Sequence, residues 1–284
     1  MDIVVFTPSI MDNSPIGIFD SGLGGLSVWR EVQKQLPNEQ IIYFADSLHC
    51  PYGRKKQDEI IDLSCSIVDK LISLGCKLIV VACNTATAAA IDVLRHKYQL
   101  PFVGMEPAIK QAALHTQTKR VAVLATKGTF DGRLYKATSE KYAHDIDVMV
   151  QIGDGLVELV ETNRYETDDA YNLLKQYVEP MVKNNVDQIV LGCTHYPFFK
   201  PQIEKIVGNN VTVIDPAPAV VKHVNDILLE YNIKSNASEA QNTLFISSSS
   251  IQNLQQLVQS LSNKSIVITQ TKIFDKNYNS FILK

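Results

Sequence analysis

The sequence predicts an α/β protein of two pseudo-symmetric three-layer lobes, each with a mainly parallel sheet, and with its chemical site in the cleft between them. Short runs rich in Val, Ile and Phe alternate along the chain with amphipathic helical patterns. The apolar runs are continuous, which is typical of parallel strands covered by helices on both faces. In addition, "IVLGCTHYP" (189–197) repeats the pattern of "IVVACNTAT" (79–87), and Cys193 lies 110 positions after Cys83. This repeat indicates two similar halves.

Each half is expected to contain four strands with their helices. The predicted strands are 16–20, 41–46, 78–83 and 102–106 in the first half, and 120–126, 146–152, 188–193 and 211–215 in the second. Most strands are separated by helical patterns. One example is the segment 56–75, whose apolar residues recur at roughly 3.6-residue spacing. The two cysteines of the repeat then follow the third strand of each half.

The C-terminal part is expected to rejoin the first half. It consists of a helix to about residue 231, a polar break at 232–242, a strand at 243–247, a helix at 251–261 and a strand at 265–269. The predicted organisation is a flexible leader (1–12), a discontinuous first lobe (13–107 plus 216–284) and a second lobe (108–215).

Composition excludes several classes of protein. The 284 residues are 45% hydrophobic and 20% charged, as in an ordinary globular protein. A net charge of −3 without a Lys/Arg cluster argues against nucleic acid as a partner, and no apolar run approaches the ~18 residues of a membrane helix. Five cysteines without CxxC spacing argue against a disulfide framework and a zinc site. We therefore expect a cytoplasmic protein with free thiols, no metal and no membrane partner.

The candidate site residues follow from the fold, because chemistry in such folds lies outside the carboxyl ends of the strands. These ends hold Asp20-Ser21, Asp46-Ser47, Cys83-Asn84-Thr85, Glu106-Pro107, Thr126, Cys193-Thr194-His195 and Asp215. Two thiols at matching places in facing halves would lie opposite each other. They could form a disulfide, bind a metal, or act as bases on the two faces of one carbon atom. The last option suits inversion of a stereocentre, with Asp20 and His195 placed to tune the thiols.

Several other residues could have either a structural or a functional role. Cys65 and Cys76 are expected to be small buried hydrophobes. Glu158 and Glu161 lie on the same helical pattern, and the residues alone do not separate them. The glycines of "DSGLGG" (20–25) allow backbone N–H groups to cradle an anion, which we expect to be a substrate carboxylate, but they lack dinucleotide-binding spacing. Asp46 and Asp215, which end strands, are expected to cap the helices that follow them.

Five motifs carry a family resemblance over residue 16 to the end of the chain. "IGIFDSGLGGLSV", "PYG", "ACNTATA", "GTF" and "GCTHYP", in this order, resemble glutamate racemase, the cofactor-independent enzyme of bacterial wall synthesis. The resemblance implies two α/β domains and interconversion of L- and D-glutamate without pyridoxal phosphate or any other cofactor. The product would supply peptidoglycan, and so cell wall biogenesis and cell shape. Members of the family commonly form homodimers in varied ways.

The matching motifs imply a set of site residues. The resemblance assigns acid/base roles to Cys83 and Cys193, assistance near Cys193 to Glu161, and substrate contact or tuning of the thiols to Asp20, Ser21, Tyr52, Gly53, Asn84, Thr85, Thr194 and His195. It suggests that Cys83 with Asp20 serves the D-substrate and Cys193 with His195 the L-substrate. The chain departs from the family at His49, where Arg is frequent, and at Asp215-Pro216-Ala217, where "DSA" is frequent. Cys50 receives no role.

Three function classes remain open on the sequence. The first is cofactor-free glutamate racemisation, and the second is racemisation of aspartate or another amino acid by the same thiol pair. The third is a non-enzymatic ligand-binding protein of two α/β lobes, which would have no need of paired thiols. Only the first two predict exchange of the substrate α-hydrogen with solvent.

Overall fold

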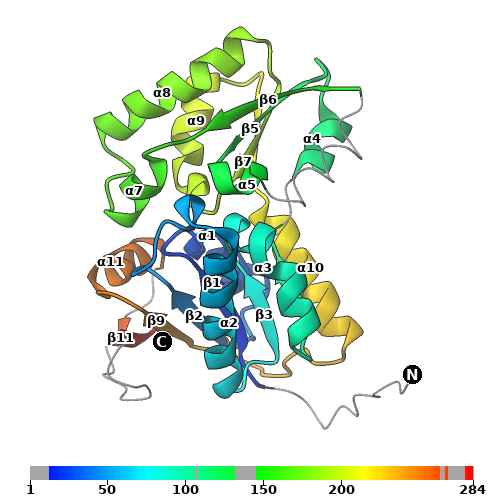
Figure 1. Cartoon of the computed structure of the whole chain (residues 1–284), viewed down its shortest axis with the longest axis vertical. Coiled ribbons are helices and arrows are strands. Elements are labelled where there is room, and N and C mark those ends of the chain that lie inside the picture. The colour runs from blue at the N-terminus through cyan, green and yellow to red at the C-terminus, as the bar shows by residue number, and fades with distance from the viewer. Residues whose placement is uncertain (1–12, 106–107, 132–144, 263–265, 268–278, 284) are drawn as a thin grey trace.

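The structure is a computed structural model that describes residues 13–105, 108–131, 145–262, 266–267 and 279–283. The predicted leader (1–12) and the predicted strand end at 106–107 lie outside the described residues. Two separate sheets with helices packed around them form two lobes, one above the other in Figure 1. The predicted two-lobe α/β class is confirmed.

The first lobe is built on a seven-stranded sheet. Its strand order is β10-β11-β9-β2-β1-β3-β4, and the five strands from β9 to β4 are parallel. The strands are β1 (Ile16–Asp20), β2 (Ile41–Ala45), β3 (Leu78–Val81), β4 (Phe102–Gly104), β9 (Thr243–Ser247), β10 (Ile266–Val267) and β11 (Asn279–Leu283). The helices of this part are α1 (Leu26–Gln35), α2 (Gln57–Ser73), α3 (Asn84–Lys97), α10 (Ala217–Glu230) and α11 (Gln252–Leu261), with the 3-10 helix η1 (Tyr52–Arg54).

The C-terminal strands join this first sheet, as predicted. Strand β9 pairs in parallel with β2, and β11 pairs antiparallel with β9. Strand β11 was not predicted, and the strand predicted at 265–269 is described only as the two-residue β10. Strand β11 lies between β9 and the edge strand β10, and its five residues "NSFIL" hold only three consecutive apolar residues, too few for a clear strand pattern.

The second lobe is built on a four-stranded parallel sheet of order β6-β5-β7-β8. Its strands are β5 (Arg120–Ala125), β6 (Asp147–Ile152), β7 (Gln188–Gly192) and β8 (Thr212–Ile214). Its helices are α4 (Ile109–His115), α5 (Lys127–Asp131), α7 (Leu156–Glu161), α8 (Asp168–Lys183) and α9 (Lys200–Val207), with the 3-10 helix η2 (Tyr196–Phe199).

The two sheets share one strand order. Counting the first four strands of each half in chain order, both sheets run second, first, third, fourth: β2-β1-β3-β4 and β6-β5-β7-β8. Cys83 and Cys193 each follow the third strand of their half. The repeat seen in the sequence therefore corresponds to a repeat of topology.

Burial on both faces of the sheets explains the continuous apolar strands. In β1, Ile16 and Ile18 belong to one hydrophobic cluster and Phe19 to another, and all three are fully buried. Replacing Ile18 by alanine would lower the free energy of unfolding by about 2–5 kcal/mol, because the close-packed interior cannot fill the cavity.

A buried ion pair, Lys77 Nζ to Glu39 Oε2 at 2.7 Å, links the residue before β3 to the turn before β2.

The lobes meet at the carboxyl ends of their central strands (Figure 1). Helix α10 follows β8 yet packs beside the first sheet, so the chain returns to the lower lobe of Figure 1 after completing the upper one. Among the described residues, no helix is both long and apolar enough to cross a membrane.

Candidate active site between the lobes

Asp20 ends β1 and is fully buried beneath the glycine turn that follows it. Its Oδ2 accepts hydrogen bonds from the backbone N–H groups of Gly22 at 3.1 Å and Gly25 at 3.0 Å. Burial raises the pKa of Asp20, although the charge of His195 and these N–H groups oppose the rise. The anion held by the turn is therefore a carboxylate of the protein itself.

This finding corrects the expectation that the "DSGLGG" turn cradles a substrate carboxylate. A third N–H of the turn, that of Leu23, donates to Glu161 Oε1 at 2.6 Å. The sequence pattern indicated an anion site at a glycine-rich turn, and the turn does hold anions. It could not indicate that the chain supplies both of them, because Glu161 lies 138 residues from Leu23.

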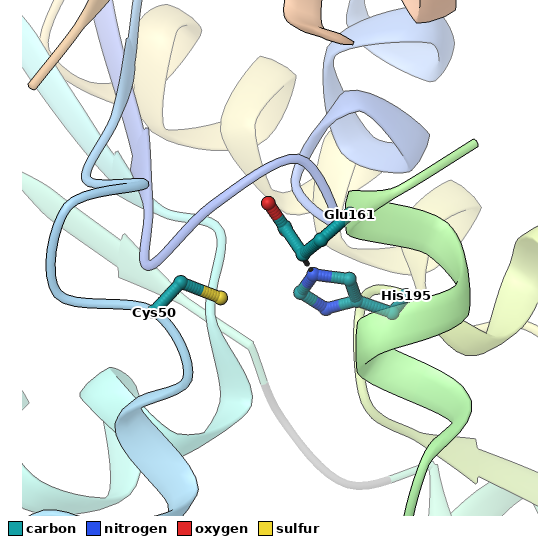
Figure 2. Close-up of side chains that lie close together, drawn as sticks. All are labelled: Cys50, Glu161 and His195. Atoms are coloured by element: carbon teal, nitrogen blue, oxygen red, sulfur yellow. Dashed lines mark hydrogen bonds and ion pairs between the residues drawn. The ribbon is translucent and has the colours of Figure 1, made fainter. Parts of the chain in front are cut away.

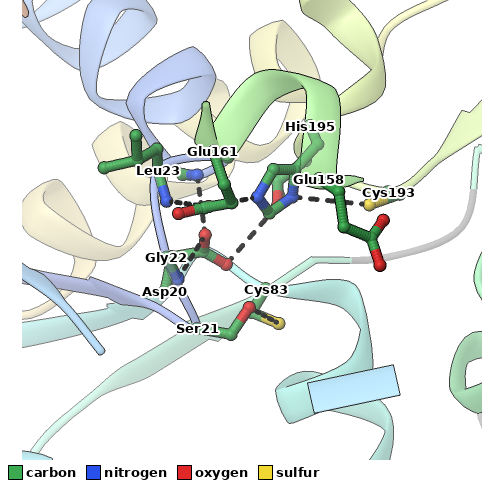
Figure 3. Close-up of polar contacts among 12 residues, drawn as sticks. Asp20, Ser21, Gly22, Leu23, Cys83, Glu158, Glu161, Cys193 and His195 are labelled. Atoms are coloured by element: carbon green, nitrogen blue, oxygen red, sulfur yellow. Dashed lines mark hydrogen bonds and ion pairs between the residues drawn. The ribbon is translucent and has the colours of Figure 1, made fainter. Parts of the chain in front are cut away.

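Cys83 lies at the N-terminus of α3, two residues after the end of β3. Its Sγ accepts a hydrogen bond from Ala86 N at 3.4 Å and donates to Ser21 Oγ at 3.7 Å. Burial raises the pKa of the Cys83 thiol, and the negative charge of Asp20 adds to this effect. The sulfur therefore holds its proton at neutral pH, with Ser21 beside it (Figure 3).

Cys193 follows β7 and begins a chain of polar contacts. Its Sγ lies 3.7 Å from His195 Nδ1, and His195 Nε2 lies 2.7 Å from Glu161 Oε1 (Figure 3). Because the same Glu161 oxygen accepts the Leu23 N–H, one carboxylate oxygen joins the imidazole to the turn of the other lobe. The sequence places Cys193 and His195 together, and the family resemblance places Glu161 near Cys193; in the structure Glu161 reaches this site through His195.

The surroundings of His195 favour its protonated form. Burial lowers its pKa, but hydrogen bonds with Cys193, Cys50 and Glu161 outweigh burial and raise the pKa well above the ordinary value of histidine. When protonated, the ring donates from both nitrogens, toward a sulfur on one side and a carboxylate on the other. Gly24 packs against the ring so closely that a Cβ at this position would lie 2.6 Å from Cε1, so a side chain here would displace the imidazole.

The two thiol groups belong to one site. Thr194 Oγ1, beside Cys193, donates to Asp20 Oδ1 at 3.4 Å, and Ser27 Oγ donates to the Thr194 carbonyl at 3.0 Å. The charge of Cys193 is also among the causes that raise the pKa of Cys83. Cys83 and Cys193 therefore approach the same interlobe region from opposite lobes (Figure 3).

Asn84 presents unused hydrogen-bonding capacity next to Cys83. Its side chain is buried, yet neither its amide nitrogen nor its amide oxygen has a partner among the described residues. A buried amide without partners costs about 1–3 kcal/mol per group, which a bound polar molecule would recover. Thr85, the next residue, shares a hydrogen bond of 3.1 Å with Thr126 of the second lobe.

The "PYG" loop is held by Asp46. Asp46 accepts from Tyr52 Oη at 2.6 Å, from Ser248 Oγ at 2.7 Å, and contacts His49 Nδ1 at 2.8 Å. The expected helix-capping role is therefore wrong for Asp46, which braces a loop instead. The Tyr52 side chain is buried and its hydroxyl is engaged, whereas Gly53, the next residue of the loop, lines the cleft.

Asp215 has the capping role predicted for it. Its Oδ1 accepts from Ala217 N at 2.9 Å at the start of α10.

A cavity of about 1090 Å³ opens between the lobes. Residues of the first lobe that line it include Gly53 and Thr85, and those of the second include Thr126 and Gly153. At its margin an exposed ion pair joins Arg54 Nη2 to Glu158 Oε1 at 2.8 Å.

The positions of the two acidic residues of α7 are now distinct. Glu158 faces Arg54 at the margin of the cavity, whereas Glu161 faces His195.

Both catalytic candidates among the cysteines are buried, Cys83 at 5% and Cys193 at 7% exposure. Both sulfurs are therefore largely shielded from solvent.

One thiol of this site, that of Cys50, has no signature in the sequence. Cys50 lies close to both His195 and Glu161, and burial raises the pKa of its thiol to about 12. No motif or spacing could have found it, since its neighbours are more than a hundred residues away in the chain. Cys76 is buried in the core, as expected, and Cys65 is half-buried.

Comparison with known proteins agrees with this geometry. The family model described as Asp/Glu/Hydantoin racemase matches residues 16–224. A glutamate racemase of Ectopseudomonas mendocina is 44% identical over 243 residues, which are 85% of this chain and 92% of the relative. The crystal structure of a glutamate racemase from Bacillus anthracis superposes with a TM-score of 0.79 at 31% identity, covering 87% of this chain and 93% of that one. An Escherichia coli glutamate racemase, in complex with L-glutamate and an activator, gives a TM-score of 0.76 at 28% identity, covering 88% and 96%.

Two α/β lobes with a thiol after the third strand of each define the class, a racemase-type isomerase with its site between domains. The chain belongs to the Asp/Glu/Hydantoin racemase family, and within it to the glutamate racemases.

Proposed function

We propose that this protein interconverts L- and D-glutamate by two-base proton transfer, with Cys83 and Cys193 as the acid/base pair and without a cofactor. The observation that carries the proposal is the placement of these thiols at equivalent strand ends of the two lobes, with different polar neighbours around each. The names of the relatives support glutamate as substrate.

The reaction follows from these neighbours. The Cys193 sulfur, beside the His195 imidazolium, takes the α-proton of L-glutamate, and the electron pair of the broken C–H bond stays on the α-carbon. The Cys83 thiol gives its proton to the opposite face, which forms a new C–H bond and D-glutamate. The raised pKa of Cys83 supplies this donor in the protonated form. The reverse reaction exchanges the two roles.

Binding of the substrate would use neutral hydrogen-bonding groups. Asn84 has an unpartnered donor and an unpartnered acceptor, and Ser21, Thr85 and Thr194 lie around the same region. The amide of Asn84 suits both charged groups of an amino acid, since it donates to a carboxylate and accepts from an ammonium group. Tyr52 and Gly53 would contribute backbone groups.

The proposal also covers the domain organisation, the cellular location and the oligomeric state of the enzyme. We propose domain boundaries of 13–107 plus 216–284 and 108–215, which the membership of β9 in the first sheet supports. D-glutamate made in the cytoplasm would serve peptidoglycan synthesis. On the family resemblance we also expect a homodimer, which sedimentation velocity would detect.

Replacement of each thiol by serine tests the proposal. Incubation of the purified protein with D- and L-glutamate, followed by circular dichroism, measures racemisation, and NMR in D₂O measures α-hydrogen exchange. We expect Cys83→Ser and Cys193→Ser to abolish racemisation and Cys65→Ser, a free thiol away from the site, to retain it. Racemisation that survives in either of the first two variants would overturn the assignment. Turnover of D- and L-aspartate in place of glutamate would favour the alternative substrate.

A further inference from the structure

Cys50, Glu161 and His195 bring three metal-binding donor types to one point. The sulfur, a carboxylate oxygen and a ring nitrogen all lie within 4.8 Å of one another. Figure 2 shows them converging from three separate segments: the loop before η1, the end of α7 and the turn after β7. Because these segments are far apart in the sequence, the cysteine spacing that argued against a zinc site could not reveal this cluster.

The donor set suits a thiophilic divalent cation. Zinc is bound by Cys, His and carboxylate ligands at about 2.0–2.3 Å, so tetrahedral ligands lie roughly 3.4–3.6 Å apart. Donors up to 4.8 Å apart would need to approach by about 1 Å, and the hydrogen bond of 2.7 Å between His195 Nε2 and Glu161 Oε1 would open to admit the cation. A thiolate and an imidazole are poor ligands for magnesium or calcium, which prefer oxygen.

The surroundings pack closely around the three donors and hold the ligands in place. Gly22 faces the cluster without a side chain, and a Cβ there would collide with the Glu161 carboxylate and lie 3.0 Å from Cys50 Sγ. The other ring nitrogen of His195 is held by Cys193 at 3.7 Å, which orients the imidazole. Three protein ligands leave a fourth position for water, as in an open zinc site.

We propose that Cys50, Glu161 and His195 form an inhibitory site for a thiophilic divalent cation, with Zn²⁺ as the probe. The inhibition rests on the proposed function, because the cation takes His195 and Glu161 away from Cys193. Binding forms bonds from the metal to Cys50 Sγ, His195 Nε2 and a Glu161 oxygen, and releases the thiol proton and the Nε2 proton to solvent. The site itself does not depend on racemisation.

Cobalt substitution tests the site without an activity measurement. Co²⁺ added to the purified full-length protein is expected to give a thiolate-to-cobalt charge-transfer band that Zn²⁺ abolishes. The band should disappear in Cys50→Ser and persist in the matched variant Cys65→Ser, which removes a half-buried thiol elsewhere. It should also persist in Cys193→Ser. A band that survives in Cys50→Ser, or that disappears only in Cys193→Ser, would overturn the proposal by placing the metal on another thiol.

Inhibition and thiol protection complete the test. The Zn²⁺ concentration that halves racemisation should rise at least about tenfold in Cys50→Ser relative to Cys65→Ser, since one ligand is lost. In the unmodified protein, Zn²⁺ should protect Cys50 from alkylation, as mass spectrometry of the peptide would detect. Unchanged labelling of Cys50 would contradict the proposal even if the variant failed to fold. If the protein did not racemise glutamate, the cobalt band would still report the site.

Discussion

Glu161 links the glycine turn of the first lobe to the His195 imidazole of the second. Its Oε1 lies 2.7 Å from His195 Nε2 and 2.6 Å from Leu23 N. In Glu161→Gln an amide oxygen can still accept one of these bonds, but the charge is lost. A hydrogen bond to a charged group contributes about 1.5–3 kcal/mol, so we expect kcat/KM to fall roughly 10- to 150-fold.

The pH profile distinguishes this role from a merely structural one. The hydrogen bond from Glu161 is one cause of the raised pKa of His195. If activity needs the imidazolium, it is lost as the pH rises through that pKa, and removing Glu161 lowers the pKa. The alkaline limb of the Glu161→Gln profile should therefore lie at lower pH than that of the parent enzyme. Glu158→Gln, on the same helix but paired with Arg54, is the matched control and should keep the parent profile.

Single-face exchange localises the effect further. Under the proposed mechanism, exchange of the L-glutamate α-hydrogen in a Cys83→Ser background depends on Cys193, and adding Glu161→Gln should slow it. Under the same mechanism, exchange of D-glutamate in a Cys193→Ser background depends on Cys83, and adding Glu161→Gln should leave it nearly unaffected. An equal loss in both backgrounds, or an alkaline limb that does not move, would refute the reasoning that Glu161 acts through His195.

Two further predictions concern buried charges. Lys77→Met leaves Glu39 without its partner in a site where both side chains are 2% exposed, so the free energy of unfolding in urea should fall by about 3–5 kcal/mol. The matched change Lys55→Met breaks a more exposed pair and should cost less than about 1 kcal/mol; equal losses would contradict the argument from burial. Asp20→Asn removes a charge that raises the pKa of Cys83, so the Cys83 thiolate should form at lower pH, as pH-dependent alkylation in a Cys193→Ser background would measure. An unchanged alkylation profile would mean that burial alone sets that pKa.

Much of the fold was predictable because its determinants are local or repeated. Continuous apolar runs identified the parallel strands, and the repeat around Cys83 and Cys193 identified the two halves. The return of the C-terminal strand β9 to the sheet of the first half was expected, while β11, which lies between β9 and the edge strand β10, lacked a pattern strong enough to predict.

The site was predictable only as far as single segments carry it. Asp20 and His195 could be assigned to the site because each lies at or just after the carboxyl end of a parallel strand, and the topology brings those ends together. The partners of the glycine turn could not be predicted, since the anions that it holds include Glu161 from another lobe. The proximity of Cys50 to His195 depends on how two lobes dock, which no local pattern encodes.

The shared strand order bears on how each direction of the reaction can be tuned. Two identical copies of one lobe, related by a twofold axis, would surround a substrate carbon with identical groups on both faces. Within a single chain the surroundings have diverged: a serine and a buried carboxylate accompany one sulfur, and an imidazolium accompanies the other. Mirror-image substrates have equal free energy in water, so kcat/KM must remain equal in both directions. Different surroundings of the two sulfurs can therefore make kcat differ between the two directions only if KM differs by the same factor. This lets the enzyme match unequal cellular concentrations of the two enantiomers without favouring either at equilibrium.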